Sequence, residues 1–413
     1  MKRKLALTVL LAWPMLMAAW HSIEKENIKS LQVILNDDFE ALPILELNST
    51  DRLLISFDEL SHNYHRFIYR LEPCNPDWTP ADGLFESEWL EGLNNQTIDD
   101  YKNSVNTTLL YTHYQFQFPN NYTNVRLSGN YRLRIIDDEQ DEEVAVVELR
   151  VVEQLMKVTL GATTNTDLDL NGRYQQVEMQ VNWSQMHITD PNEQIQTFVM
   201  QNGREDNMKV NVRPNYNTPS SLQWEHNRQL IFDAGNEYHK YEALDPTHTT
   251  MGLEDVSWDD STHTWHAVPM QCEPRINYLY DEDANGAFLL RNSNNYEAEN
   301  TSEYVYMHYR LQPAHYYSDA RVVVSGRWTT EAPSCYTMTY NETDRSYGVS
   351  ILQKLGYYNY QLLLVDMDGT THPLPEEGSF FQTENTYQAL VYYRETGGRY
   401  WRLAGFTDIT YRH

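Results

Sequence analysis

The sequence has 413 residues, and at the usual domain size of about 100–150 residues this length predicts about three folded units. Its formal net charge is −28, from 31 Lys and Arg against 59 Asp and Glu. Nucleic acids and anionic lipids are bound mainly through Lys and Arg, so this charge excludes both as partners. The acidic excess is typical of a soluble protein, and an acidic face for a basic partner is the alternative interpretation. Aromatic residues make up 13% of the chain, which favours half-buried strands over helices.

The N-terminus predicts an export signal. A basic run, Lys-Arg-Lys at residues 2–4, precedes an apolar run over residues 5–19. This run is shorter than the roughly 20 residues of a membrane-spanning helix, and no later segment is apolar and long enough to span a membrane. We therefore expect residues 1–21 to be a signal peptide cleaved near Ala18 to His21. The mature protein is expected to be soluble, without direct insertion into a membrane.

From Ile28 onward, short apolar or alternating runs are separated by turn residues, a pattern typical of antiparallel β-sandwiches. A first unit is expected over residues 22–154. Its predicted strands cover residues 31–35, 53–57, 64–71, 111–118, 128–135 and 144–152. The acidic stretch 137–143 is expected to be a solvated hairpin tip before the last strand.

A second unit is expected over residues 155–291. Its predicted strands cover residues 157–160, 174–183, 195–201 and 207–212, and a hairpin joins 275–280 to 287–291. The polar, Asn-rich stretch 292–302 is the predicted inter-domain linker. A third unit is expected over residues 303–413, with strands at 304–311, 321–328, 336–340, 348–351, 357–365 and 386–394. Since no long helical periodicity occurs, the predicted fold is all-β, with three tandem immunoglobulin-like or early-set β-sandwich domains.

The cysteines do not predict a disulfide framework. Cys74, Cys272 and Cys335 are an odd number in a chain expected to be exported, so at least one has no partner within the chain. A bridge between Cys272 and Cys335 is one pairing that the sequence leaves open.

No catalytic, cofactor or metal motif is found, and the 14 His residues show no ligand spacing. Residues 281–286 resemble the start of a calcium loop, with Asp281, Asp283, Asn285 and Gly286, but the twelfth position is Asn292 instead of Glu. We expect an Asn-Gly hairpin turn there. The adjacent carboxylates at 58–59 and 99–100 are expected to lie in solvated turns, because neighbours in sequence need not converge on a substrate.

Two aromatic residues of the third unit suggest a carbohydrate-binding alternative. The phrases around Trp328 and Tyr357 resemble the early-set β-sandwiches that include starch- and glycogen-binding modules. If the rings were exposed, they could serve as sugar platforms. The competing interpretation is that they fill the core.

A set of phrases spread over residues 28–406 carries a second, broader resemblance. They include Phe57-Asp58-Glu59-Leu60, Cys74-Asn75-Pro76-Asp77-Trp78, Ile98-Asp99-Asp100-Tyr101, Tyr111-Thr112-His113-Tyr114, Ser128-Gly129-Asn130-Tyr131, Ala234-Gly235-Asn236-Glu237-Tyr238, Gly356-Tyr357-Tyr358-Asn359-Tyr360 and Val391-Tyr392-Tyr393-Arg394. In this order they resemble the type IX secretion system plug protein family of Bacteroidetes, formerly a domain of unknown function. One departure is Pro76, where the family usually has Ala.

This resemblance implies a periplasmic, noncatalytic protein. Such a protein docks on the periplasmic mouth of an outer-membrane β-barrel translocon and closes it while no cargo passes. The family supplies no catalytic, cofactor or metal residues to carry over, and it does not define the docking residues.

Overall fold

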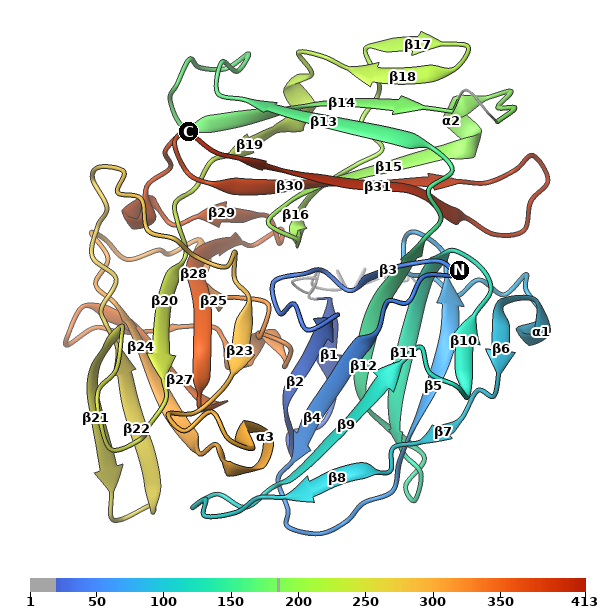
Figure 1. Cartoon of the computed structure of the whole chain (residues 1–413). Coiled ribbons are helices and arrows are strands. Elements are labelled where there is room, and N and C mark those ends of the chain that lie inside the picture. Colours follow the sequence, from blue (N-terminus) through green and yellow to red (C-terminus); the bar gives the residue numbers. More distant parts are fainter. Residues whose placement is uncertain (1–19, 184–185) are drawn as a thin grey trace, which may run out of the picture.

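The computed structural model describes residues 20–183 and 186–413, so the predicted signal peptide lies outside the described residues except for its last two positions. The described chain is built of strands, and none of its helices exceeds four residues. The all-β prediction is therefore confirmed. The chain forms three packed units, seen at the right, top and left of Figure 1.

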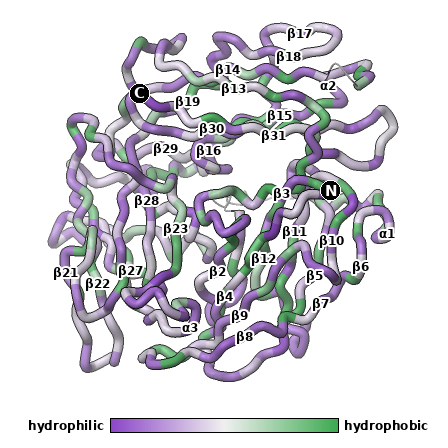
Figure 2. The backbone as a smooth tube through the Cα atoms, viewed as in Figure 1, coloured by the Kyte–Doolittle hydropathy of each residue, from purple (hydrophilic) through white to green (hydrophobic). Residues whose placement is uncertain are grey.

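The strands form where apolar and polar side chains alternate. In β14, Val177, Met179 and Val181 point into the core, while Glu178 and Gln180 are more exposed. Figure 2 shows the same arrangement across the molecule, with hydrophobic stretches inside strands such as β12 and β23 and hydrophilic loops outside them.

The first unit is a sandwich of two main sheets. Its elements are β1 (His21–Ile23), β2 (Ile28–Leu35), β3 (Ile44–Glu46), β4 (Leu53–Glu59), β5 (Phe67–Cys74), α1 (Glu86–Trp89), β6 (Leu90–Gly92), β7 (Gln96–Thr97), β8 (Asp100–Asn103), β9 (Thr112–Phe118), β10 (Thr123–Val125), β11 (Gly129–Asp137) and β12 (Glu142–Val152). One sheet has the order β2-β4-β9-β8, and the strands β12-β11-β5-β7 form the other. Because β1 pairs with β12 from His21 onward, His21 belongs to this fold.

The second unit combines two distant parts of the chain. Its elements are β13 (Lys157–Thr163), β14 (Tyr174–Asn182), α2 (Pro191–Gln194), β15 (Ile195–Gln201), β16 (Arg204–Val210), β17 (Tyr216–Thr218), β18 (Ser221–Trp224), η1 (Arg228–Leu230), β19 (Ile231–Asp233), β30 (Asn385–Tyr393) and β31 (Arg402–Tyr411). The strands β16-β15-β30-β31 continue through β12 into the first unit, so one sheet runs through both units. The link is a parallel pairing of Val152 in β12 with Leu403 in β31.

The third unit lies between these two parts in sequence. Its elements are β20 (His239–Ala243), β21 (Leu253–Asp259), β22 (Thr264–Pro269), β23 (Phe288–Leu290), α3 (Ala298–Thr301), β24 (Tyr304–Leu311), β25 (Ala320–Ser325), η2 (Pro333–Cys335), β26 (Thr339–Asn341), β27 (Ser346–Lys354), β28 (Gly356–Asp366), β29 (Thr371–Pro373) and η3 (Pro375–Glu377). One sheet has the order β21-β22-β24-β27-β26, and the other is built around β28.

The cores divide the chain differently from the predicted boundaries at 155–291 and 303–413. Val177 and Trp224 share a core with Tyr387 and Val391, whereas β20 to β29 enclose a separate core. The physical reason is that the sheet of β13, β14, β17, β18 and β19 needs a second sheet to cover its apolar face, and β30 and β31 complete that second sheet together with β15 and β16. We therefore propose units of residues 20–153, 154–233 with 385–413, and 234–384.

The predicted linker 292–302 does not join two units. It connects β23 to β24 within the third unit and contains α3. Asn300 and Ser302 are buried in it, and the carbonyl oxygen of Asn300 accepts a hydrogen bond from the Val105 amide of the first unit. Polar composition was misleading here because these side chains and carbonyls are used to dock two units together.

Candidate functional site: the junctions between the units

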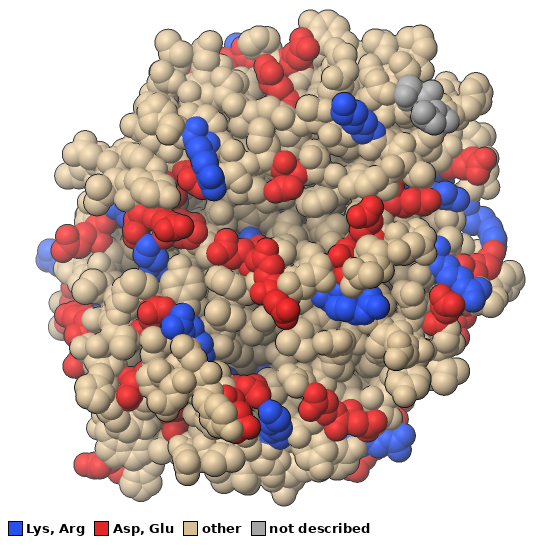
Figure 3. Space-filling model, viewed as in Figure 1, with Lys and Arg blue, Asp and Glu red and all other residues tan. Residues whose placement is uncertain are grey.

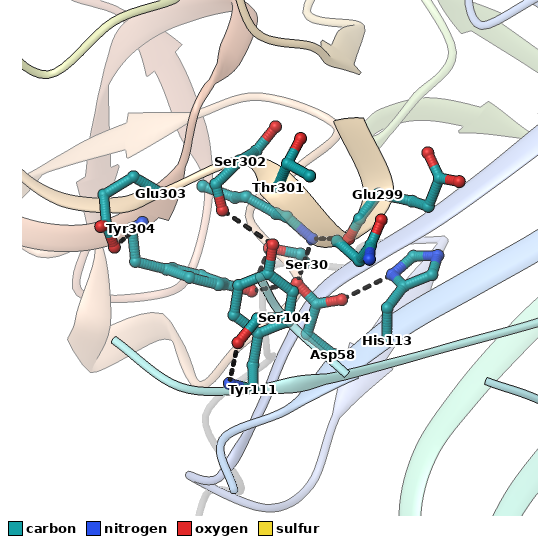
Figure 4. Close-up of polar contacts among 12 residues, drawn as sticks. Ser30, Asp58, Ser104, Tyr111, His113, Glu299, Thr301, Ser302, Glu303 and Tyr304 are labelled. Atoms are coloured by element: carbon teal, nitrogen blue, oxygen red, sulfur yellow. Dashed lines mark hydrogen bonds and ion pairs between the residues drawn. The ribbon is translucent and has the colours of Figure 1, made fainter. Parts of the chain in front are cut away.

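The first and third units meet at a buried ion pair (Figure 4). Asp58 Oδ2 accepts hydrogen bonds from Lys354 Nζ and Tyr304 Oη, each at 2.6 Å, and Asp58 Oδ1 lies 2.6 Å from His113 Nδ1. Asp58 and His113 are cross-strand neighbours in β4 and β9, and Tyr304 and Lys354 are cross-strand neighbours in β24 and β27. Two cross-strand pairs from different units therefore face each other.

No part of the Asp58 or Lys354 side chain is exposed. Burial by itself raises the pKa of Asp58, but the Lys354 ammonium and the His113 hydrogen bond outweigh it, so the pKa is lower than that of an ordinary aspartate. The prediction that residues 58–59 lie in a solvated turn is therefore wrong. The local pattern around Asp58 does not indicate this, because Lys354 and Tyr304 come from the facing unit and His113 from a strand 55 positions away.

Hydrogen bonds to main-chain carbonyls surround this ion pair. Tyr111 Oη donates to the Ser302 carbonyl oxygen at 2.8 Å, and Lys354 Nζ donates to the Glu299 carbonyl oxygen at 2.6 Å. The ammonium of Lys354 also lies 4.1 Å from the centre of the Tyr111 ring. The network thus satisfies the buried charges from both units, as a buried ion pair requires.

The first and second units meet at Arg150. Its guanidinium lies 4.1 Å from the ring centre of Trp20 and 4.8 Å from that of Trp78. It forms an ion pair with Glu205 of β16, and both side chains are nearly fully buried. Trp20 Nε1 in turn donates to the Gly203 carbonyl oxygen at 2.6 Å. Arg150 therefore reaches the second unit through the Glu205 carboxylate, and Trp20 reaches it through the hydrogen bond to Gly203, while both indole rings stack on Arg150 within the first unit.

A cavity of about 500 Å³ adjoins Arg150 where the three units meet. Its lining includes Trp78, Glu148, Arg204, Asp206, Arg327 and Tyr336. Burial, and then the nearby Glu205 carboxylate, raise the pKa of Glu148 to about 7. This junction is thus looser than the one at Asp58.

Acidic and basic side chains are interspersed on the face shown in Figure 3, and this face does not gather the acidic residues into one patch. On this face the acidic residues behind the net charge of −28 are therefore distributed as in an ordinary solvated surface, and they do not form a single acidic docking patch.

The predicted sugar platform is contradicted. Trp328 is only 7% exposed, and its Nε1 donates to the Asn359 carbonyl oxygen at 2.8 Å. A Cβ on Gly326 would lie 2.4 Å from this Nε1, so the ring folds back onto a glycine. Tyr357 is half-buried, with its ring 6.4 Å from that of Phe39 in the first unit. Neither ring offers an open stacking face like the one predicted.

The predicted Asn-Gly turn is confirmed, because Asn285 and Gly286 have φ of 48° and 82° and the Ala287 amide donates to the Ala284 carbonyl oxygen. The preceding stretch 275–280 is not a strand, so the hairpin prediction is wrong on that side. Asp281, the first residue of the calcium-like stretch, forms an ion pair in which its Oδ1 lies 2.6 Å from Lys240 Nζ.

Asp99 and Asp100 are exposed, as predicted for a solvated turn, although Asp100 begins β8.

The three cysteines, Cys74, Cys272 and Cys335, are free thiols, so the bridge left open between Cys272 and Cys335 does not form. Cys335 is exposed, whereas Cys272 is buried beside His239 and Glu377. These three side chains are the described residues that could hold a metal ion. Their wide separation in sequence concealed the cluster, since His239 and Glu377 are 138 positions apart.

Within residues 20–183 and 186–413, no helix is long and apolar enough to cross a membrane.

Comparison with known proteins gives two informative matches. The model of the family described as type 9 secretion system plug protein 1st domain matches residues 28–153. The crystal structure of a hypothetical protein from Parabacteroides merdae matches 95% of this chain and 99% of that chain, with 31% sequence identity and a TM-score of 0.90. No curated protein matches the sequence.

Two other solved structures align poorly. The C-terminal domain of the Streptococcus pyogenes antigen I/II-family protein AspA covers 94% of this chain and 100% of its own, at 8% identity and a TM-score of 0.18. Dimeric latent PorU from Porphyromonas gingivalis covers 93% of this chain and 34% of its own, at 11% identity and a TM-score of 0.15. Neither score supports a shared fold.

Proposed function

We propose that this chain, whose residues 28–153 match the type 9 secretion system plug protein family, is a noncatalytic gate for the translocon of that system. It binds the periplasmic mouth of the outer-membrane β-barrel and closes it while no cargo passes. The observation that carries this proposal is the family match over residues 28–153, together with the full-length match to one solved structure.

The construction of the chain suits a gate. A barrel wide enough for folded cargo leaks solutes when open, so its plug must keep its shape against the rim. Here one sheet runs through two units, and the third unit is joined to the first by the buried pair of Asp58 and Lys354. Three small domains thereby act as one block.

The charge of the chain supports a protein partner in the periplasm. With a net charge of −28, the surface repels anionic lipid headgroups and nucleic acids. The proposed location, the periplasm next to the outer membrane and bound to the translocon, rests on the family match over residues 28–153.

The test is capture of the partner from native membranes. Protein carrying a C-terminal affinity tag is purified from detergent-solubilised outer membranes, and we expect a very large β-barrel protein to co-purify. A deletion strain should admit a hydrophilic antibiotic too large for ordinary porins, and plasmid-borne wild-type protein should restore exclusion. Recovery of free monomer alone, together with unchanged permeability of the deletion strain, would contradict the proposal.

A further inference from the structure

Three side chains of different metal-binding types meet in the third unit. His239 comes from β20, Cys272 from the segment after β22, and Glu377 from η3. One nitrogen, the sulfur and one carboxylate oxygen all lie within 4.8 Å of one another. None of these residues is used at the junctions between the units.

The cluster is buried and held in place. The His239 and Glu377 side chains are 17% and 9% exposed, and Cys272 is 5% exposed. The His239 ring stacks on Tyr360 at 5.2 Å between ring centres, and Tyr360 Oη lies 3.7 Å from Cys272 Sγ. Such supporting contacts orient ligands around a metal ion.

We propose that His239, Cys272 and Glu377 bind one Zn²⁺ ion. A thiolate, an imidazole and a carboxylate form a set of S, N and O donors that suits Zn²⁺, whereas Ca²⁺ and Mg²⁺ prefer oxygen alone. Zn²⁺ ligands lie about 2.0–2.3 Å from the ion, so ligand atoms sit about 3–4 Å apart. The Nε2 of His239 lies 2.8 Å from both carboxylate oxygens of Glu377, so binding of the ion would replace this hydrogen bond and separate the two ligands slightly, and the Cys272 sulfur lies within 4.8 Å of both.

Three protein ligands leave a fourth position of a tetrahedral site open. The cavity of about 500 Å³ at the unit junctions is lined by other residues, so this fourth position does not open into it.

Arg275 competes with the ion. Arg275 Nη2 lies 2.7 Å from His239 Nδ1, and Arg275 Nε lies 3.5 Å from Glu377 Oε2. This guanidinium supplies the positive charge next to Glu377 that Zn²⁺ would otherwise supply, so its removal should favour the ion. Removal of a ligand side chain should therefore weaken Zn²⁺ binding, whereas removal of the Arg275 charge should strengthen it.

The experiment measures Zn²⁺ binding to the full mature protein without an affinity tag, stripped with a chelator and titrated in competition with a chromogenic dye. We expect one Zn²⁺ per chain. Cys272→Ser and His239→Ala should each weaken binding by more than about 100-fold, because loss of a supporting contact alone costs roughly 10–100-fold. Arg275→Gln should tighten binding. With Co²⁺ as the probe, the thiolate-to-cobalt absorption band should appear in the wild type and vanish in Cys272→Ser.

Controls come from the chain itself. Cys335→Ser removes the exposed thiol, and His266→Ala breaks the His266–His308 pair, whose ring nitrogens lie 2.8 Å apart. Both should leave Zn²⁺ affinity unchanged. Glu377→Gln keeps the size of the side chain, so it tests the site if another variant fails to fold. Less than about 0.1 Zn²⁺ per wild-type chain, unchanged affinity in the ligand variants, or loss of binding in His266→Ala would overturn the proposal.

Discussion

The two junctions of the first unit solve the same problem differently. Toward the third unit, Asp58 and Lys354 form a fully buried ion pair whose charges are satisfied by hydrogen bonds from both sides. Toward the second unit, Arg150 forms an ion pair with Glu205 next to a cavity of about 500 Å³ lined by Glu205, and the guanidinium also contacts the Trp20 and Trp78 rings of its own unit. The first arrangement demands exact geometry, because an unpaired buried charge is costly. The second tolerates adjustment, because rings and water can shift around a cation.

The largest effect is expected at the tight junction. Lys354→Met leaves the Asp58 carboxylate buried without its cation, and breaking such a pair costs about 3–5 kcal/mol. Urea unfolding at pH 7, followed by tryptophan fluorescence, measures the loss. The double variant Asp58→Asn with Lys354→Met should recover most of it, since no buried charge is then left unpaired and Tyr304 Oη can still donate to the Asn side-chain oxygen. A loss below about 1 kcal/mol in Lys354→Met would show that the pair is not essential to the junction.

A smaller effect is expected at the looser junction. Arg150→Met removes the stacking on Trp20 and Trp78 and leaves Glu205 without its partner. We expect a loss of about 2–3 kcal/mol in the free energy of unfolding, because Glu205 lines the cavity and water can reach it. Arg150→Lys keeps the charge but not the planar stacking, so it should fall between wild type and Arg150→Met. A larger loss than that of Lys354→Met would reverse the comparison.

The junctions should also respond to pH in opposite directions. The pKa of Glu148 in the folded protein, about 7, lies above its ordinary value, so stability rises as the pH falls from above 7 toward 4.5. The pKa of Asp58 is lowered, so its contribution is present above its ordinary value and is lost as the pH falls through the lowered one.

Glu148→Gln should therefore flatten the change in stability between pH 5 and 8 by about 1–3 kcal/mol. Denaturant unfolding at several pH values measures this slope. The double variant Asp58→Asn with Lys354→Met is the matched control, since it removes both charges of the tight junction and should leave the slope in that range unchanged. The same slope in wild type and Glu148→Gln would contradict the assignment.

The smallest effect is expected at the rim of the tight junction. Lys102 Nζ lies 2.7 Å from Glu299 Oε1, and the two side chains are 40% and 32% exposed. Lys102→Ala should cost less than about 1 kcal/mol, and the difference should shrink further in high salt. A cost close to that of Lys354→Met would mean that the rim, and not the centre, holds the units together.

Strands could be predicted from the sequence because the alternation of apolar and polar side chains is visible within each short segment. The predicted strand 304–311 coincides with β24, and 357–365 lies within β28. The sites could not be predicted, because they join side chains across sheets. Asp58 and Lys354 are 296 positions apart, and nothing in either local pattern indicates the other.

The aromatic residues and the domain boundaries show the same limit. The residues around Trp328 suggest a ligand platform. In the structure its ring packs against Gly326 and donates a hydrogen bond to the Asn359 carbonyl oxygen, so it lies in the core. The alternation over residues 386–394 predicts the strand β30. It does not predict that β30 pairs with β15 of the second unit, because periodicity does not specify the neighbouring strand.

The late strands β30 and β31 have a consequence for folding. Until β30 and β31 arrive, β15 presents an open edge and one sheet of the second unit lacks two of its four strands, whereas β12 is already paired with β1 and β3. During synthesis these residues emerge after the strands that they complete. A chain that ends before residue 385 therefore leaves the apolar face of the β13-β14-β18-β17 sheet uncovered and the edge of β15 unpaired, and both features favour aggregation.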